Sequence, residues 1–237
     1  MSSRKTFKFR LYPNRKQREQ MLATLDACRE IYNAGLQERI GAWRRRTLVN
    51  YDAQQNQLPE IKAIRTELLD LYSHALQDPL PRLDKAFKAF FRRCKSGPTP
   101  GFPRFKGRNR FDSFTYPDGF KLSGGRLQLS KIGNIKVKQH RSMEGKSKTV
   151  TIKRECGGWY ATFVVEFEPV ALVRKDTEIG VDVGLESFAV FSDGTVVENP
   201  RWYRNAQAEL RKTQRRVARR RKGSKRRRKA VLLLQKA

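Results

Sequence analysis

The feature that most constrains this chain is a strand pattern that stands alone at its beginning. Residues 5–12 alternate apolar with mostly cationic side chains, and Phe7, Phe9 and Leu11 share one face. This two-residue period is typical of a half-buried strand, and a strand needs a partner for its backbone groups. Further strand patterns appear only after residue 97. We therefore expect the intervening residues to be an insertion into a β-domain.

The intervening residues have helical periodicity. Asn14 follows a proline and can cap the first predicted helix, whose apolar stripe includes Cys28 and Tyr32. A second apolar stripe runs through residues 61–75 and a third through residues 83–94. Two to four helices are predicted here, enough to form a small bundle.

The composition changes at residues 97–103, where glycines and prolines are too frequent for a helix. Two glycine pairs, at 124–125 and 157–158, indicate hairpin turns among the strand patterns that follow. The six predicted strands cover residues 111–116, 119–122, 126–129, 134–138, 149–154 and 159–167. Short strands this close together favour a small barrel or sandwich.

A different pattern begins after Pro169. The predicted strands there cover residues 178–183, 187–191 and 195–198. Asn199 and Pro200 can then provide the N-cap and the first residue of a long basic helix, which Gly223 and Ser224 interrupt. Three strands followed by a helix is the order in which an RNase-H-like sheet opens. The whole chain is therefore assigned to the α+β class.

The chain carries 52 Lys and Arg against 23 Asp and Glu, a net charge of +29. A field of this size attracts polyanions, above all nucleic acids. A hydrophobic fraction of 38% excludes wholesale disorder. No apolar run approaches the roughly 18–20 residues of a membrane span, and the N-terminus lacks the apolar core of a signal peptide. We expect a cytoplasmic, nucleoid-associated protein without a membrane partner.

The three cysteines, Cys28, Cys94 and Cys156, include no Cys-x-x-Cys pair. Their spacing excludes a zinc ribbon within this chain and disfavours disulfides. Cys28 and Cys94 fall on apolar helix faces and are predicted to be small buried thiols. His74 and His140 lie far apart in the sequence, and each is predicted to stand alone. No cysteine- or histidine-based catalytic site is indicated.

Two acid-free stretches are candidate binding surfaces. Residues 211–229 contain 13 Lys and Arg, whereas a merely solvated helix normally mixes signs, so phosphate contacts are predicted. The second stretch is residues 85–110, and within it residues 102–108 interleave aromatics with cations. This suits stacking on bases beside phosphate contacts; the alternative is a domain-joining loop whose aromatics fill the protein core. The predicted nucleic-acid-binding residues are Arg10, Arg92, Arg93, Arg104, Phe105, Lys106, Arg108, Arg215, Arg216, Arg219, Arg220, Arg221, Lys222 and Lys225.

Asp182 is the candidate catalytic residue. It interrupts the apolar residues 179–183, where a carboxylate is costly unless a cation or hydrogen bonds compensate. It is either a metal ligand on the first strand of a ribonuclease-H-like nuclease or an ordinary aspartate bonded to a neighbouring turn. A two-metal site needs several converging acids, and Glu186, Asp193 and Glu198 are not placed to complete one.

Several strings of residues resemble the TnpB family, insertion-sequence products long labelled OrfB transposases and related to type V CRISPR nucleases. They occur in the family's order and cover nearly the whole chain. The strings are Lys8-Phe9-Arg10-Leu11-Tyr12-Pro13, Cys28-Arg29, Tyr32-Asn33, Phe102-Pro103-Arg104-Phe105-Lys106, Ser113-Phe114-Thr115-Tyr116, Gly180-Val181-Asp182-Val183-Gly184-Leu185, and Lys222-Gly223-Ser224-Lys225 with Arg227-Arg228-Lys229.

The resemblance implies an organisation and an activity. The implied parts are a wedge-like β-barrel at residues 1–13 and 97–172, a helical recognition insert at 14–96, and an incomplete RuvC (RNase-H-like) domain with a basic bridging helix at 173–237. The implied activity is RNA-guided cleavage of DNA, with a guide RNA and target double-stranded DNA as partners and Mg²⁺ or Mn²⁺ as cofactor. Asp182 matches the family's first catalytic, metal-binding aspartate. The family's second acid, its zinc ribbon and its final aspartate would follow Ala237, so the metal site is expected to be incomplete.

Two functions therefore remain open. The chain is either a truncated nuclease or a non-catalytic RNA-guided DNA-binding protein or repressor; a basic RNA-binding protein of ribosomal type is a third, disfavoured interpretation. For both of the first two, we expect this chain to bind RNA and DNA and to cut neither. These patterns do not indicate an oligomeric state.

Overall fold

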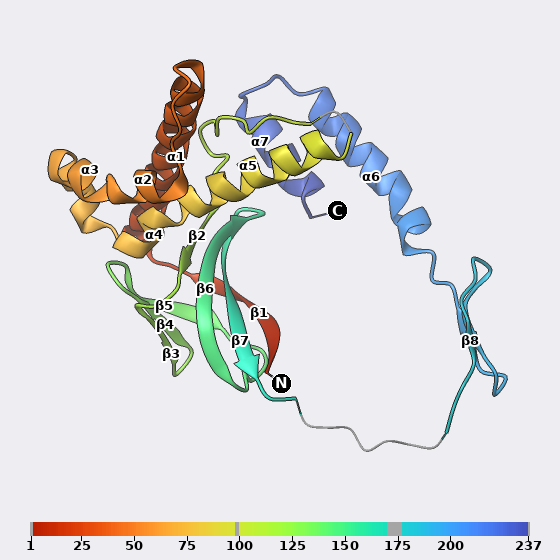
Figure 1. Cartoon of the computed structure of the whole chain (residues 1–237). Helices are drawn as coiled ribbons and strands as arrows, with labels where there is room; N and C mark the ends of the chain where they lie inside the picture. The colour runs from red at the N-terminus through yellow and green to blue at the C-terminus, as the bar shows by residue number, and fades with distance from the viewer. Residues whose placement is uncertain (1, 98–99, 170–176, 237) are drawn as a thin grey trace. The chain divides into compact units, whose positions relative to one another are not determined.

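The computed structural model describes residues 2–97, 100–169 and 177–236 (Figure 1). The chain divides into two compact units, Met1–Pro169 and Val170–Ala237, called here the N-terminal and C-terminal units. The boundary expected between residues 172 and 173 lies outside the described residues. Each unit is described by itself.

The N-terminal unit is built on an antiparallel sheet of seven strands in the order β2-β6-β7-β1-β5-β4-β3. The opening strand β1 lies inside this sheet, with Phe7 opposite Phe163 of β7 and Leu11 opposite Val137 of β5. The pairing predicted for the opening strand is confirmed. The strands are β1 (Ser3–Tyr12), β2 (Ser113–Tyr116), β3 (Phe120–Ser123), β4 (Arg126–Leu129), β5 (Gly133–Lys138), β6 (Lys146–Glu155) and β7 (Gly158–Phe167).

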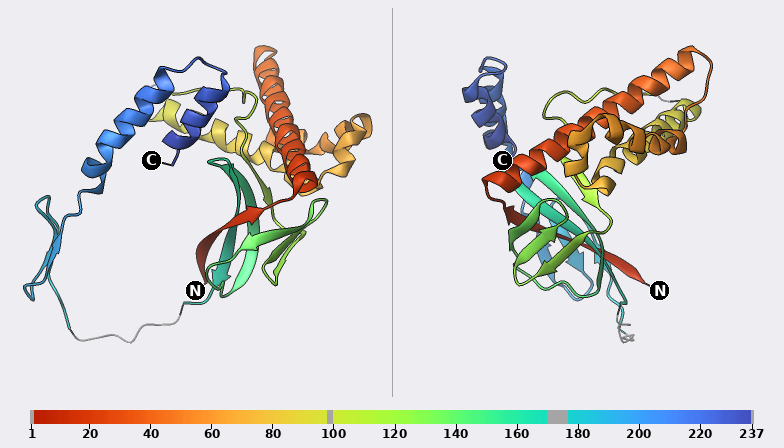
Figure 2. Two further views of the ribbon diagram at one scale, coloured as in Figure 1. Left: turned by 180° about the vertical axis from the view of Figure 1, so that it is seen from behind. Right: turned by 90° about the vertical axis from the view of Figure 1, so that its left-hand side faces the viewer.

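The sheet curls, and the helices of the unit gather at one of its ends (Figures 1 and 2). Alternation along β1 and β7 buries Phe9, Leu11, Phe163 and Val165, which are at most 2% exposed. The predicted stripe of the first helix, from Met21 to Leu36, joins the same core cluster. Each large apolar side chain buried this way stabilises the unit by about 1.5–3 kcal/mol, so the curled sheet and its insertion share one core.

The helical insertion begins as predicted. Asn14 caps α1 (Arg15–Arg44) in a capping box, in which its side chain accepts from the Gln17 N–H and the Gln17 side chain accepts from the Asn14 N–H. The other helical segments are α2 (Tyr51–Asn56), α3 (Leu58–Ile64), the 3-10 helix η1 (Thr66–Asp70), α4 (Ser73–Gln77) and α5 (Pro79–Lys95). The third predicted stripe, residues 83–94, is a helix within α5.

The continuous stripe predicted at residues 61–75 is wrong, because three short segments occupy it. Arg65 leaves the helical region (φ −104°, ψ 78°) while its guanidinium binds Glu30 and Glu67. Ile64 is consequently 84% exposed, whereas Leu68 is buried in a second apolar cluster. Each of the three short segments still buries one leucine, which is Leu58, Leu68 or Leu76, whereas Leu69 is 56% exposed.

The two thiols expected to be buried differ. Cys28 is buried, donates to the carbonyl oxygen of Ala75 at 3.2 Å, and has its pKa raised by burial. Cys94 is exposed, because the last turn of α5 extends past the core and buries none of its residues there. The prediction for Cys94 is therefore wrong.

The C-terminal unit contains a small antiparallel sheet in the order β10-β9-β8 and two helices. Its elements are β8 (Val181–Asp182), β9 (Ser187–Phe191), β10 (Val196–Glu198), α6 (Trp202–Ala218) and α7 (Lys225–Leu234). β8 is much shorter than the predicted 178–183. Just before it, the Gly180 carbonyl accepts from the Ser192 N–H, but the Gly180 N–H donates to the Ser192 hydroxyl in place of a backbone carbonyl of β9. Ser224 accepts from the Arg227 N–H and caps α7, so the predicted interruption of the basic helix is confirmed.

The predicted start of the basic helix is wrong by two residues. Arg201, in the left-handed region at φ +47°, takes the N-cap position of α6. The Asn199 side chain is occupied instead by the Arg201 N–H and the Leu185 carbonyl, at 3.0 and 2.9 Å. Asn199 therefore closes the loop before the helix. No helix among the described residues is long and apolar enough to cross a membrane.

Candidate nucleic-acid interface

The most basic surface of the chain is a helical hairpin formed by α6, the turn at residues 219–224, and α7. The Arg227 guanidinium donates to the carbonyls of Val217 and Arg220, at 2.8 and 3.1 Å, which satisfies carbonyls at the end of α6. Thr213 and Ala230 are the buried residues of the two helices. The Arg227 side chain thus ties α7 to the end of α6 and to the basic turn between the two helices.

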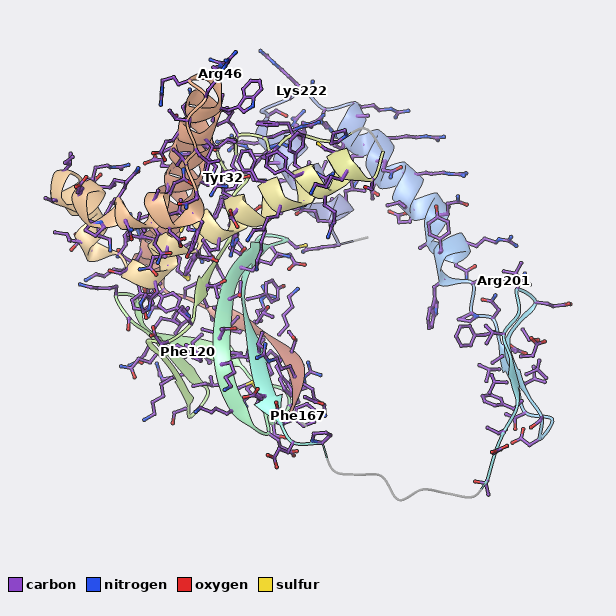
Figure 3. The ribbon with its side chains drawn as sticks, in the orientation of Figure 1. Tyr32, Arg46, Phe120, Phe167, Arg201 and Lys222 are labelled. Atoms are coloured by element: carbon purple, nitrogen blue, oxygen red, sulfur yellow. The ribbon has the colours of Figure 1, made fainter. Side chains whose placement is uncertain are left out.

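One stripe of the hairpin is free of acids. Arg211, Arg215 and Arg219 follow one another at a spacing of four residues, and a parallel row follows at 212, 216 and 220, so all six cations share one helix face. All six are exposed. The predicted contact residues Arg221 and Lys222 lie in the turn, and Lys225 begins α7; all three are exposed as well (Figure 3, which labels Lys222). A single acid, Glu209, lies 3.8 Å from Lys212.

The second basic surface is the segment between α5 and β2 in the N-terminal unit. Its sequence combines aromatic and cationic residues, and the structure separates their roles. Phe102 packs edge-on against Phe87 and Phe90 of α5, with ring centroids 5.6 and 5.2 Å away. Phe105 is 51% exposed, and among the described residues no ring or cation packs on it. Phe102 remains 46% exposed, so neither phenylalanine fills the core, and base stacking by Phe105 stays a prediction.

The cations of this segment are also divided. The Lys106 ammonium lies 5.4 Å from the centroid of the Tyr32 ring, and Arg93 donates to the Gly101 carbonyl at 3.1 Å. Arg104 and Arg108 are exposed. On β1, the exposed Arg10 lies 5.5 Å from the Tyr12 ring. Arg92 is exposed on the last turn of α5.

Asp182 lies on β8, exposed to solvent and opposite Val190 of β9. Val190 is in turn opposite Val196, so the aspartate and two valines form one row on the same sheet face. Asp193 binds the Thr195 N–H at 2.8 Å, and this backbone hydrogen bond lowers the pKa of its carboxyl. Among the described residues no three His, Cys, Asp or Glu side chains are grouped to hold a metal ion. Mg²⁺ needs more oxygen ligands than one carboxylate, so these residues do not by themselves fit that ion.

One polar cluster was missed by sequence reasoning, which left His74 alone. The His74 Nδ1 atom lies 2.7 Å from the Asp118 carboxylate and 3.0 Å from the Tyr72 hydroxyl, which itself donates to Asp118. These hydrogen bonds, first that of Tyr72 and then that of His74, lower the pKa of Asp118. Gly119 is in the left-handed region at φ +67°, and a Cβ there would meet the Tyr72 hydroxyl at 2.7 Å.

Asn33 makes a long-range contact that sequence reasoning did not predict. Its side chain donates to the Lys106 carbonyl at 2.9 Å and accepts from the Lys106 N–H at 2.8 Å. A polar residue directly after the buried Tyr32, inside the apolar stripe of a helix, was the available signal. The partner 73 residues away could not be found from that signal.

Two family profiles match the chain. One, a helix-turn-helix domain of the IS605 OrfB group, matches residues 1–47, and the other, described as a probable transposase of the same group, matches residues 162–237. In the structure, residues 1–47 contain β1 and the single long helix α1.

The sequence is similar to two curated proteins described as candidate RNA-guided DNA endonucleases. InsQ of Escherichia coli K12 is 33% identical over 226 residues, which is 93% of this chain and 55% of InsQ. A protein of Streptomyces pristinaespiralis is 31% identical over 230 residues, which is 92% of this chain and 55% of that protein. The chain thus spans about half the length of these relatives.

Two solved structures also align with the chain, both at low similarity. A Cas12f1–sgRNA–target DNA complex aligns with a TM-score of 0.43 and 14% identity, over 97% of this chain and 64% of the other. A CRISPR–Cas12f ternary complex aligns with a TM-score of 0.44 and 12% identity, over 93% and 57%. The two profiles and the two sequence relatives agree with the ordered strings found in the sequence, and the chain belongs to the IS605 OrfB transposase family, the TnpB family.

Proposed function

We propose that this chain is an RNA- and DNA-binding protein of transposon origin that holds a guide RNA and its target double-stranded DNA. The observation that carries this proposal is the acid-free stripe of six exposed cations on α6 and the turn after it. The relatives are described as candidate RNA-guided DNA endonucleases, which supports the two ligands. A protein that binds DNA in this way would associate with the nucleoid.

The organisation follows the same proposal. The curled sheet, residues 1–13 and 97–172, would be the wedge-like domain, and residues 14–96 the recognition insert. The C-terminal unit would be the first part of an RNase-H-like domain, because three antiparallel strands precede a helix there. The hairpin of α6 and α7 would be the bridging element that contacts both nucleic acids.

The experiment measures binding of the whole chain to a structured RNA and to a DNA duplex across a salt series. If six to ten phosphates are contacted, affinity falls about 10³–10⁵-fold between roughly 50 and 200 mM salt, because bound phosphates release their counterions. Replacing Arg215, Arg216 and Arg219 by Ala is expected to reduce the slope of log K against log salt by up to about 2.7 on DNA.

A matched control removes the same charge elsewhere. Lys88, Lys148 and Lys153 already pair with Asp84, Glu166 and Glu155, respectively, so their replacement by Ala changes the slope less. A salt series that is nearly flat for the wild-type protein would refute the electrostatic proposal. Equal slopes for the two triple variants would show that the hairpin is not the contact surface.

For catalysis we propose that this chain alone binds without cutting. Asp182 matches the family's metal-binding aspartate, but by itself this carboxylate does not fit Mg²⁺ or Mn²⁺ as a hydrolytic site, so no step is assigned to it. The residues beside Asp182 in its cross-strand row are Val190 and Val196. The row therefore contains one carboxylate, whereas a two-metal site needs several. The same row of one aspartate and two valines favours the non-catalytic alternative, an RNA-guided repressor, because it lacks further carboxylates.

Cleavage is tested with purified chain, guide RNA, target DNA and either metal, beside Asp182→Ala. We expect both proteins to be inert and to bind equally well. Cleavage that disappears in Asp182→Ala would overturn the proposal, since further carboxylates would then have to reach Asp182.

A further inference from the structure

The segment between α5 and β2 is fastened at several points to the N-terminal unit. The Asn33 side chain makes two hydrogen bonds to the backbone of Lys106, and Phe102 packs on two rings of α5. Further on, the Arg110 N–H bonds the Gly107 carbonyl at 3.0 Å and closes a turn. Both sides of Phe105 are thus fixed to the body of the unit.

Phe105 lies between these fixed points with its ring half exposed. An aromatic side chain on an unanchored loop would turn inward at little cost, whereas here Phe102 packs on two rings of α5 while it remains 46% exposed, and the Lys106 ammonium lies over the Tyr32 ring. The backbone bonds to Asn33 hold the neighbouring residue in place. The ring is therefore presented to solvent by the surrounding contacts.

The surroundings of this ring are cationic. Arg104, Arg108 and Arg110 are exposed, and the sequence holds no acid from residue 85 to residue 110. The next acid, Asp112, is engaged by Arg154 at 2.8 Å. A flat apolar ring between exposed guanidinium groups matches a nucleotide, whose base has a π face and whose phosphates are anionic.

We propose that residues 104–108 form a preformed site for one unpaired nucleotide, in which the Phe105 ring stacks on the base while Arg104 and Arg108 contact the adjacent phosphates. Asn33 is its positioning residue. This inference rests on the proposed function and deepens it. The hairpin supplies salt-dependent attraction to paired and unpaired strands alike, whereas a stacking ring selects unpaired bases, because the faces of bases inside a duplex are already covered.

The test uses the full chain and three probes of equal length: single-stranded RNA, single-stranded DNA of the same sequence, and the DNA duplex. A 2-aminopurine in each single strand reports stacking by its fluorescence. Stacking on one aromatic contributes about 5- to 150-fold in affinity. Phe105→Leu is expected to weaken single-strand binding within that range, to leave duplex affinity within about twofold, and to reduce 2-aminopurine quenching.

The salt dependence separates stacking from charge. Phe105→Leu removes no cation, so its salt slope should equal that of the wild type, whereas replacing Arg104 and Arg108 by Ala should lower the slope. The control is Trp43→Leu, since Trp43 is 80% exposed and precedes three arginines, and among the described residues no ring or cation is packed on it. An equal loss in Trp43→Leu would overturn the proposal.

The positioning role of Asn33 is tested by a double-mutant cycle. If Asn33 acts by holding the segment, Phe105→Leu costs much less in an Asn33→Ala background than in the wild type. Additive effects would refute that role. If Phe105→Leu loses affinity for the RNA and the DNA single strand alike, the site accepts any unpaired base. If it loses affinity for the RNA strand alone, the site is specific for RNA.

Failure of this inference differs from failure of the proposed function. If the wild-type chain binds with the expected salt slope but Phe105→Leu retains full single-strand affinity, the stacking site is wrong and the hairpin stands. If the wild type binds neither RNA nor DNA, the proposed function itself is wrong.

Discussion

The junction between the insertion and the sheet depends on one ion pair, and its removal is a sharp test of the fold. The Asp78 carboxylate accepts from Arg82 at 2.5 Å and from the Thr115 N–H of β2 at 3.0 Å. Arg82 in turn donates to the carbonyl and the hydroxyl of Ser113, at 3.1 and 2.9 Å. Asp78 and Arg82, at the start of α5, thereby hydrogen-bond backbone groups on the outer edge of β2, which pairs only with β6.

The loss of unfolding free energy expected on removing Asp78 follows from how deeply the Asp78–Arg82 pair is buried. The Asp78 side chain is 15% exposed and that of Arg82 32%. Removing one partner of a buried pair costs about 3–5 kcal/mol, because the other charge is left uncompensated. Water still reaches about a third of Arg82, so we expect Asp78→Ala to cost about 2–4 kcal/mol. That is a large share of the roughly 5–15 kcal/mol that stabilises a typical domain.

The assay is urea unfolding followed by tryptophan fluorescence, in which the buried Trp159 of β7 reports the sheet. Asp78→Asn keeps an acceptor for the Thr115 N–H and should lose less than Asp78→Ala. The control is Glu19→Ala, since the Glu19–Arg15 pair is 63% and 93% exposed and should contribute less than about 0.5 kcal/mol. If Asp78→Ala costs no more than Glu19→Ala, the reasoning about this junction is refuted.

Three further predictions concern local contacts. Asn14→Ala removes the capping box of α1 and should cost about 1 kcal/mol in urea unfolding, against little change for Gln37→Ala, an exposed residue inside the same helix. Arg227→Ala removes the side-chain hydrogen bonds to the carbonyls of Val217 in α6 and Arg220 in the turn, and should lower the far-ultraviolet helical signal and cost about 1–2 kcal/mol; an unchanged helical signal would argue against this cap. Because Tyr72 and His74 lower the pKa of Asp118, their bonds stabilise the fold above the ordinary aspartate pKa of about 4 and lose that effect as the pH falls through the lowered value. Asp118→Asn should remove this part of the acid sensitivity, seen in stability measured from pH 3 to 7, and an unaltered pH profile would contradict it.

The strands of the N-terminal unit could be predicted from the sequence because two local signals agreed. Alternating apolar residues defined β6 and β7, and the turn between them contains Gly157 at a positive φ of +76°, although it lies at residues 156–157, one residue before the predicted glycine pair. The partner of β1 followed from the absence of any other strand pattern near it. Both inferences use short-range information, which a sequence carries directly.

The broken helix at residues 61–75 could not be predicted, because no glycine or proline marks it. Arg65 ends α3 through its two ion pairs, one of them with Glu30 on α1, far away in the sequence. The early start predicted for α6 failed similarly, since Asn199 has the residue type of a cap but bonds the Leu185 carbonyl. In each case a tertiary partner decided between two local options of similar free energy.

The same limit applies to the candidate binding surfaces. Composition locates the cations, but an arginine that donates to a carbonyl is not available to a phosphate in the same way as one in solvent. Arg93 and Arg227 make such bonds, and Lys106 lies over Tyr32, whereas Arg104 and Arg219 are exposed. The cations that bond within the protein hold the segment between α5 and β2 and the α6–α7 hairpin in place. The exposed cations beside them can then contact a ligand without first being ordered. Because an ordered site loses less conformational entropy on binding, we expect the internally bonded cations to contribute to affinity for the proposed nucleic-acid ligand without touching it.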